Sequence, residues 1–225
     1  MTRRSWAVAR QYVLPPVVFG VAALLIGLLT GRPLLRKAAW FSLGSAVLGT
    51  LFFRDPERPL EPEPGVAYAA ADGLVTAVDE VDEPWLPGGT AERVSVFLNL
   101  HNVHVNRSPL AGRIEKMEKS EGGFSPALFG GVEDNYSNRT LLDGERGPFV
   151  VVQRAGMIAR RISPWIEEGQ RVETGERIGL IHFGSRTDVL FPPGEVEFLV
   201  APGDKVRAGL TPIARYREVR RGEAH

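Results

Sequence analysis

Four prolines in the eleven residues 55–65, DPERPLEPEPG, constrain the fold of this chain more than any other feature of its sequence. Proline has no backbone N–H group and also restricts the residue before it, so neither a helix nor the interior of a sheet can run through this segment. We therefore expect an extended linker that separates residues 1–54 from residues 66–225. The second part is long enough to bury a hydrophobic core of its own.

Residues 1–54 contain two uncharged apolar runs. The first, residues 11–31, has 21 residues, and at about 1.5 Å per residue a helix of this length just crosses a hydrocarbon core of about 30 Å. The second, residues 38–53, has 16 residues and is short for a full crossing, although Trp40 suits a membrane interface. We predict a membrane-associated helical hairpin, or a partly inserted pair of helices.

Charge divides between the same two parts of the chain. Residues 1–54 hold seven Arg and Lys residues and no acid, whereas the remainder holds 20 basic and 27 acidic residues. An acidic globular part disfavours nucleic acid as a partner, because phosphate binding needs a basic face.

Arg3 and Arg4 also fit a cleaved signal peptide, but the second apolar run disfavours its removal. The chain has no Cys, which excludes disulfides and thiolate chemistry.

The pattern of residues 66–225 is that of short β-strands. Apolar and polar residues alternate, β-branched residues are common, and Gly and Pro recur between the runs. A weak repeat, GQRVETG at 169–175 and GDKVRAG at 203–209, is typical of the flattened barrel of lipoyl- and biotinyl-carrier domains. No carrier lysine stands between its halves. We predict a mainly β (α+β) domain, a flattened lipoyl/biotinyl-like barrel or sandwich, with the helical hairpin at its N-terminus.

The HNVH segment places His101 and His104 three residues apart. On one helix face this spacing could bind a metal, but the flanking residues have the pattern of a strand, where such positions point to opposite faces. A metal site is therefore the weaker interpretation, and we predict none. Two structural histidines are the plain alternative.

A Gly-Ser pair, Gly184–Ser185, interrupts the apolar run IHFGSRTDVLFP. Ser185 could be a turn residue, and as a hydrolase nucleophile it lacks the second glycine of the G-x-S-x-G elbow. A third role is self-cleavage, in which Ser185 Oγ attacks the Gly184 carbonyl and converts the amide to an ester. Loss of the Ser185 α-proton then eliminates the ester, and the resulting dehydroalanine hydrolyses to a pyruvoyl group.

These segments together resemble the phosphatidylserine decarboxylase family in its short prokaryotic form. The resemblance covers essentially the whole chain and rests on FFRDPER (52–58), AADG (70–73), LHNVHVNRSPLAGRI (100–114) and GLIHFGSRTDVLFP (179–192). It implies a self-cleavage triad of Asp72, His104 and Ser185, with Ser185 becoming the pyruvoyl cofactor. Cleavage after Gly184 would give chains 1–184 and 185–225 that stay associated.

The resemblance also implies the reaction and its setting. The substrate would be phosphatidylserine in the bilayer, converted to phosphatidylethanolamine and CO2, with His101 acting in the decarboxylation step. The catalytic domain would lie on the cytoplasmic side of the cell membrane, and a homo-oligomer is compatible with it. Arg107 and Arg186 are candidate phosphate ligands by charge. The segment EDNYSNRT (133–140) departs from the family's N-E-R-N pattern at Tyr136 and Ser137.

Two alternatives remain open at the level of sequence. A membrane-tethered barrel that binds partners without chemistry would show the same repeat and apolar runs. The same chemistry could also act on another serine-headgroup lipid, such as an ether-linked archaetidylserine, because the reacting end is identical.

Overall fold

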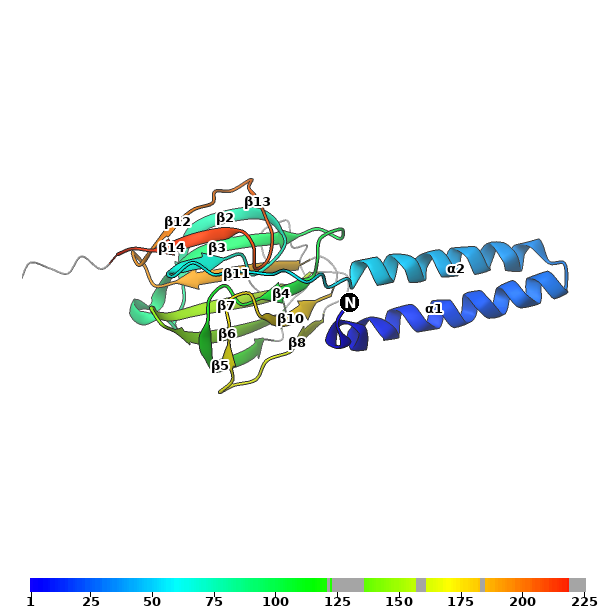
Figure 1. Cartoon of the computed structure of the whole chain (residues 1–225), viewed down its shortest axis with the longest axis horizontal. Helices are drawn as coiled ribbons and strands as arrows, with labels where there is room; N and C mark the ends of the chain where they lie inside the picture. The colour runs from blue at the N-terminus through cyan, green and yellow to red at the C-terminus, as the bar shows by residue number, and fades with distance from the viewer. Residues whose placement is uncertain (121, 123–135, 157–160, 183–184, 219–225) are drawn as a thin grey trace, which may run out of the picture. The chain divides into compact units, whose positions relative to one another are not determined.

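The computed structural model describes residues 1–120, 122, 136–156, 161–182 and 185–218. The chain forms two compact units, Met1–Glu57 and Arg58–His225 (Figure 1). The boundary falls inside the proline-rich segment.

The first unit is a hairpin of two antiparallel helices, α1 (Arg3–Leu29) and α2 (Pro33–Phe52). Thr2 caps α1, because its side chain accepts a hydrogen bond from the Ser5 backbone N–H at 3.3 Å. Pro33 starts α2 at a position where the missing N–H group costs nothing. The predicted helical pair is confirmed.

Small side chains line the contact between the two helices. Ala9 and Ala39 are fully buried, and a Cβ added to Gly20 would lie 2.8 Å from Leu43 Cγ. Small residues let two helix backbones approach closely, as in membrane helix pairs. Apolar side chains on the outside are exposed, with Phe41 at 83%.

Of the described helices, α1 is long and apolar enough to cross a membrane, and α2 does not meet the same test. The composition and length of α1 favour membrane association.

The second unit is built from fourteen described strands. Their bounds are β1 (Val66–Tyr68), β2 (Gly73–Asp82), β3 (Thr90–Leu98), β4 (Val105–Arg107), β5 (Gly112–Ser120), β6 (Ser137–Gly144), β7 (Gly147–Ala155), β8 (Ile162–Pro164), β9 (Arg171–Val172), β10 (Arg177–Ile181), β11 (Ser185–Phe191), β12 (Val196–Phe198), β13 (Lys205–Val206) and β14 (Pro212–Tyr216).

Eight of these strands form one curled, antiparallel sheet in the order β13-β2-β3-β11-β7-β6-β5-β9. Two three-stranded sheets, β1-β14-β12 and β4-β10-β8, complete the domain (Figure 1). The main hydrophobic core includes Val96, Val151, Val189, Phe191 and Ile213. The predicted mainly β fold is confirmed, and its large sheet is a curled half-barrel.

The two copies of the sequence repeat occupy the two edges of the eight-stranded sheet. β9 lies in the first copy and β13 in the second, and each carries a buried valine, Val172 or Val206. The second glycines of the copies, Gly175 and Gly209, both have positive φ, which a glycine adopts without strain. A Cβ on Gly209 would lie 3.5 Å from Gly175 Cα, so the turns that follow the two edges meet. The two edges of the curled sheet are therefore brought close together at these turns.

Candidate active site

Ser185 is the first residue of β11, a central strand of the large sheet. It pairs with Leu98 of β3 on one side and with Ala155 of β7 on the other, and it is fully buried. Its Oγ atom makes no hydrogen bond within the part of the chain that the structure describes. Buried hydroxyls are normally hydrogen-bonded, so Ser185 Oγ is an exception that it shares with Ser95 Oγ and the Tyr216 hydroxyl among the described residues. Gly184, the other half of the predicted cleavage pair, lies outside the described residues.

The histidine segment forms a turn between β3 and β4, where the sequence pattern predicted a continuous strand. The Asn102 backbone N–H donates to the Asn99 carbonyl, and the Asn102 side chain accepts from the Asn99 N–H, each at 2.9 Å. Asparagine forms such local bonds readily and so overrides the strand pattern. The turn exposes His101 and leaves His104 fully buried.

His104 is held in one tautomer by its surroundings. Its Nδ1 lies 3.0 Å from the carbonyl oxygen of Asn102, and since a carbonyl only accepts, Nδ1 carries the proton in the neutral ring. Nε2 is then the basic nitrogen. The His104 carbonyl accepts from the Ile181 N–H at 3.1 Å, which brings this histidine to the end of β10, four residues before Ser185 in the chain.

Asp72 lies at the start of β2, in the AADG segment. Its carboxylate is bound by the guanidinium group of Arg58 and by the backbone N–H of Ala208 at 2.8 Å. Gly73 follows because nothing larger fits: a Cβ there would lie 2.0 Å from the Phe97 carbonyl oxygen. The A-D-G pattern thus combines a buried carboxylate with a close backbone contact.

The segment before Asp72 runs antiparallel to the histidine segment. The Tyr68 N–H donates to the Pro109 carbonyl, and the Arg107 N–H donates to the Ala70 carbonyl. Asp72 and His101 line one pocket of about 480 Å³, together with Asn99 and Asn102. Within the described residues Asp72 makes no hydrogen bond to His104. The structure therefore brings Asp72 and His101 together, while the link from Asp72 to His104 stays a prediction.

A chain of buried amides lies beside Ser185 that the sequence did not reveal. Gln153 donates to Asn106 Oδ1 at 2.7 Å, and Asn106 donates to Thr187 Oγ1 at 3.2 Å. Asn138 extends the chain by donating to Gln153 Oε1 at 3.1 Å. These bonds fix β4, which follows His104, against β11, which begins at Ser185.

His182 is another buried group next to the predicted cleavage point. Its Nε2 lies 3.0 Å from Ser163 Oγ, and the side chain is fully buried. Burial, with the charge of Arg161 adding to it, lowers the pKa of His182 to about 4. The imidazole is therefore neutral at neutral pH.

The two candidate phosphate ligands are buried and bonded within the domain. Arg107 donates to the Gly175 carbonyl at 2.8 Å, in the turn where the two repeat copies meet. Arg186 binds Asp188 with two hydrogen bonds, at 2.8 and 3.0 Å. Burial alone would raise the pKa of Asp188, but Arg186 and Arg154 hold it below its usual value. Both candidate arginines therefore form hydrogen bonds that hold parts of the domain together.

Tyr136 and Ser137, where the sequence departs from the family pattern, lie at the start of β6. Tyr136 packs against a small cluster of Ala155, Ile162 and Ile181, and its carbonyl accepts from the Ala155 N–H at 2.9 Å. Ala155 is the register partner of Ser185. The altered segment therefore borders the candidate site through Ala155.

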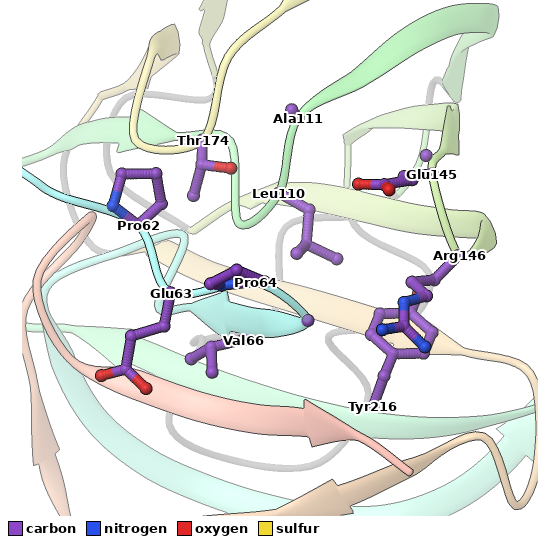
Figure 2. Close-up of a pocket in the computed structure, with 12 residues that line it drawn as sticks. Pro62, Glu63, Pro64, Val66, Leu110, Ala111, Glu145, Arg146, Thr174 and Tyr216 are labelled. Carbon is purple, nitrogen blue, oxygen red and sulfur yellow. The ribbon is translucent and has the colours of Figure 1, made fainter. Parts of the chain in front are cut away.

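A second pocket, of about 210 Å³, lies elsewhere in the domain (Figure 2). Val66, Leu110, Arg146 and Tyr216 line it. Arg146 belongs to the turn that begins β7, and β7 ends at Ala155 beside Ser185, so this pocket is at the other end of the sheet. Within the described ranges no three His, Asp or Glu side chains gather as metal ligands.

Comparison with known proteins defines the class of this protein as a carboxy-lyase. A model of a decarboxylase family, described as phosphatidylserine decarboxylase, matches residues 46–214. The chain belongs to the phosphatidylserine decarboxylase family. It is accordingly a decarboxylase, and this membership favours the enzyme over a non-catalytic tethered barrel.

Several relatives named phosphatidylserine decarboxylase proenzyme are similar over most of their length. The protein of Symbiobacterium thermophilum is 41% identical over 198 residues, which are 84% of this chain and 91% of the relative. That of Streptomyces coelicolor is 41% identical over 208 residues, 92% of this chain and 90% of the relative. That of Thermobifida fusca is 48% identical over 164 residues, 73% of this chain and 71% of the relative.

Proposed function

We propose that this chain is the proenzyme of a self-processing, pyruvoyl-dependent phosphatidylserine decarboxylase. The observation that carries the proposal is the buried Ser185 Oγ, which begins a central strand and makes no hydrogen bond to the described residues. A serine with no structural partner at this position fits the precursor of a pyruvoyl group. The proenzyme names of the relatives support the same conclusion.

Self-cleavage starts with attack of Ser185 Oγ on the carbonyl carbon of Gly184. His104 Nε2 takes the hydroxyl proton, since Nδ1 is already committed to the Asn102 carbonyl. The Gly184–Ser185 amide becomes an ester, and the amine of Ser185 is freed. Removal of the Ser185 α-proton then breaks the Cβ–O bond, and hydrolysis of the dehydroalanine consumes one water and releases one ammonia. Asp72 supplies the negative charge that favours the imidazolium state of His104.

The two products remain one domain. Residues 185–225 include β11, which pairs with β3 and β7 in the middle of the large sheet. They also include β13, paired with β2, and β14, paired with β1. Separation of the chains would break the core of the domain, so cleavage leaves the fold intact and keeps the new N-terminus buried.

The pyruvoyl group at position 185 supplies an electron sink for the departing carboxylate, as pyridoxal phosphate does in other decarboxylases. His101 lines the pocket that contains Asp72, on an exposed turn that substrate can reach. It delivers the proton to the substrate carbon that loses CO2. In this scheme the buried His104 acts as the base in the cleavage step, and the exposed His101 donates a proton to the substrate.

The apolar helices suit an enzyme whose substrate is a membrane lipid. Phosphatidylserine stays in its bilayer, and α1 has the length and composition to anchor the enzyme there. We place the catalytic domain on the cytoplasmic side of the cell membrane.

Release of labelled CO2 from carboxyl-labelled phosphatidylserine in detergent micelles tests this function. The wild-type protein should release CO2 and form phosphatidylethanolamine, and Ser185→Ala should release none. An ether-linked serine lipid of the same headgroup, assayed in parallel, separates the two substrate classes. No CO2 from either lipid, with protein that is folded and cleaved, would contradict the decarboxylase assignment to this site.

A further inference from the structure

We propose that Arg58 is a positioning residue for self-cleavage and that it acts through Asp72. This inference rests on the proposed function, because it gives the triad carboxylate a partner that the reaction scheme does not include. Arg58 comes from the proline-rich segment and not from a strand of the barrel.

The geometry of this ion pair is that of a fixed support. Arg58 Nη1 lies 2.5 Å from Asp72 Oδ1, and Nη2 lies 2.8 Å from Oδ2. The two side chains are only 8% and 10% exposed. A planar guanidinium that binds both carboxylate oxygens fixes the plane of the carboxylate as well as its position, which a lysine cannot do.

Ala208 ties this pair to the second copy of the repeat. Its carbonyl accepts from Arg58 Nη1 at 2.8 Å, and its N–H donates to Asp72 Oδ1 at 2.8 Å. The Asp72 carboxylate thus joins three segments through hydrogen bonds. They are the linker, the AADG segment and the repeat turn at 203–209. Oδ2 keeps acceptor capacity after these bonds, since a carboxylate can accept about four.

The location of the Arg58–Asp72 ion pair links the orientation of the Asp72 carboxylate to self-cleavage. Asp72 lines the pocket that His101 also lines, and its segment runs antiparallel to the one that follows His104. The carboxylate acts on the histidines only from the orientation that Arg58 imposes. Loss of Arg58 would leave a buried carboxylate without its cation and free to turn.

The first experiment is the rate of self-cleavage of Arg58→Met and Arg58→Lys, followed by intact mass after synthesis in detergent. We expect cleavage to slow by about tenfold or more in Arg58→Met and by less in Arg58→Lys, which keeps the charge but not the fork. Arg93→Met is the matched control, because Arg93 binds both oxygens of Asp79, at 2.9 and 2.7 Å, in the far half of β2. The control should fold and cleave at the wild-type rate.

A double variant separates positioning from folding. If Arg58 acts through Asp72, then Arg58→Met/Asp72→Asn cleaves no more slowly than Asp72→Asn alone. Added guanidinium ion should restore cleavage to Arg58→Gly but not to Arg58→Gly/Asp72→Asn. Wild-type cleavage in Arg58→Met, or a double variant far slower than Asp72→Asn, would overturn the inference. A wild-type protein that never cleaves would instead overturn the proposed function.

Discussion

Strand β11 pairs with β3 and β7 along its length, yet its two ends lie in different surroundings. At the far end Phe191 packs in the main core, with ring centroids 6.4 Å from Phe198 and 6.0 Å from Tyr216. At the near end Ser185 is equally buried, between Leu98 and Ala155, and Thr187, the next side chain on the same face of the strand, joins the buried amides. One strand thus carries a packed apolar end and a second end, here called the polar end, that holds Ser185 and Thr187.

The difference fits the proposed self-cleavage, in which the chain is cut without losing its fold. The apolar end and the pairing on both sides supply stability that does not depend on the Gly184–Ser185 bond. The polar end can therefore hold the buried polar groups to which we assign the cleavage, although such groups cost stability in themselves. Substitutions at the near end should change cleavage, and substitutions at the far end should change stability alone.

The largest effect should come from the two histidines at the polar end. His104→Gln should slow self-cleavage by about 10³-fold, because it removes the base for the Ser185 hydroxyl. His101→Gln is the matched variant three residues away, and it should cleave normally while losing CO2 release. A time course by intact mass, with the CO2 assay alongside, separates the two. Normal cleavage in His104→Gln would break the assignment.

The second effect is a loss of stability in acid through His182. Its folded pKa of about 4 lies below the ordinary value of 6.5, so the unfolded chain takes up the proton first as the pH falls. Stability is complete above about pH 6.5 and falls by up to about 3 kcal/mol as the pH drops to about 4. Thermal melting against pH measures the slope. The His182→Gln variant should show a flatter curve, and an unchanged slope in it would assign the loss to other groups.

A third prediction concerns the buried amide chain. Asn106→Leu leaves the Gln153 amide without its acceptor, so unfolding should become easier by about 2 kcal/mol. Cleavage should slow as well, because β4 loses its bond to Thr187 of β11. Melting temperature and cleavage rate are measured on the same preparation. A lower melting temperature with cleavage unchanged would show that the chain supports the fold only.

The smallest effect should appear at the apolar end. Phe191→Leu keeps a hydrophobic side chain but removes part of the ring, and should cost about 1 kcal/mol of stability. The rate of self-cleavage should not change, since Ser185 and its neighbours are untouched. A slowed reaction in this variant would mean that the two ends of β11 are coupled, and the comparison would fail.

The helical hairpin and the β-rich domain could be predicted because their signals are local. Uncharged runs specify apolar helices, and the four prolines prevent either element from crossing the linker. The sequence also showed the repeat, but it did not show that the two copies lie at the two edges of one sheet. Pairing of β9 with β5 and of β13 with β2 joins residues that are far apart in the chain, which no local pattern encodes.

The site residues were predictable only in part, for a related reason. Asp72, His101, His104 and Ser185 stand in recognisable segments, whereas Arg58 sits in a charged, proline-rich stretch that resembles solvent-exposed linker. Asn106 follows a strand pattern in which a polar residue would normally face water. Their roles depend on partners in distant segments, Asp72 for Arg58 and Gln153 for Asn106.

Denaturing intact-mass spectrometry of the wild-type protein and of Ser185→Ala, both folded in detergent, tests the central claim most directly. The wild type should give two fragments, the smaller of roughly 4 to 5 kDa for residues 185–225 at about 110 Da per residue, without a free N-terminal amine. Ser185→Ala should remain a single 24.6 kDa chain. A single 24.6 kDa species from the wild type as well would contradict the conversion of Ser185 to a pyruvoyl group.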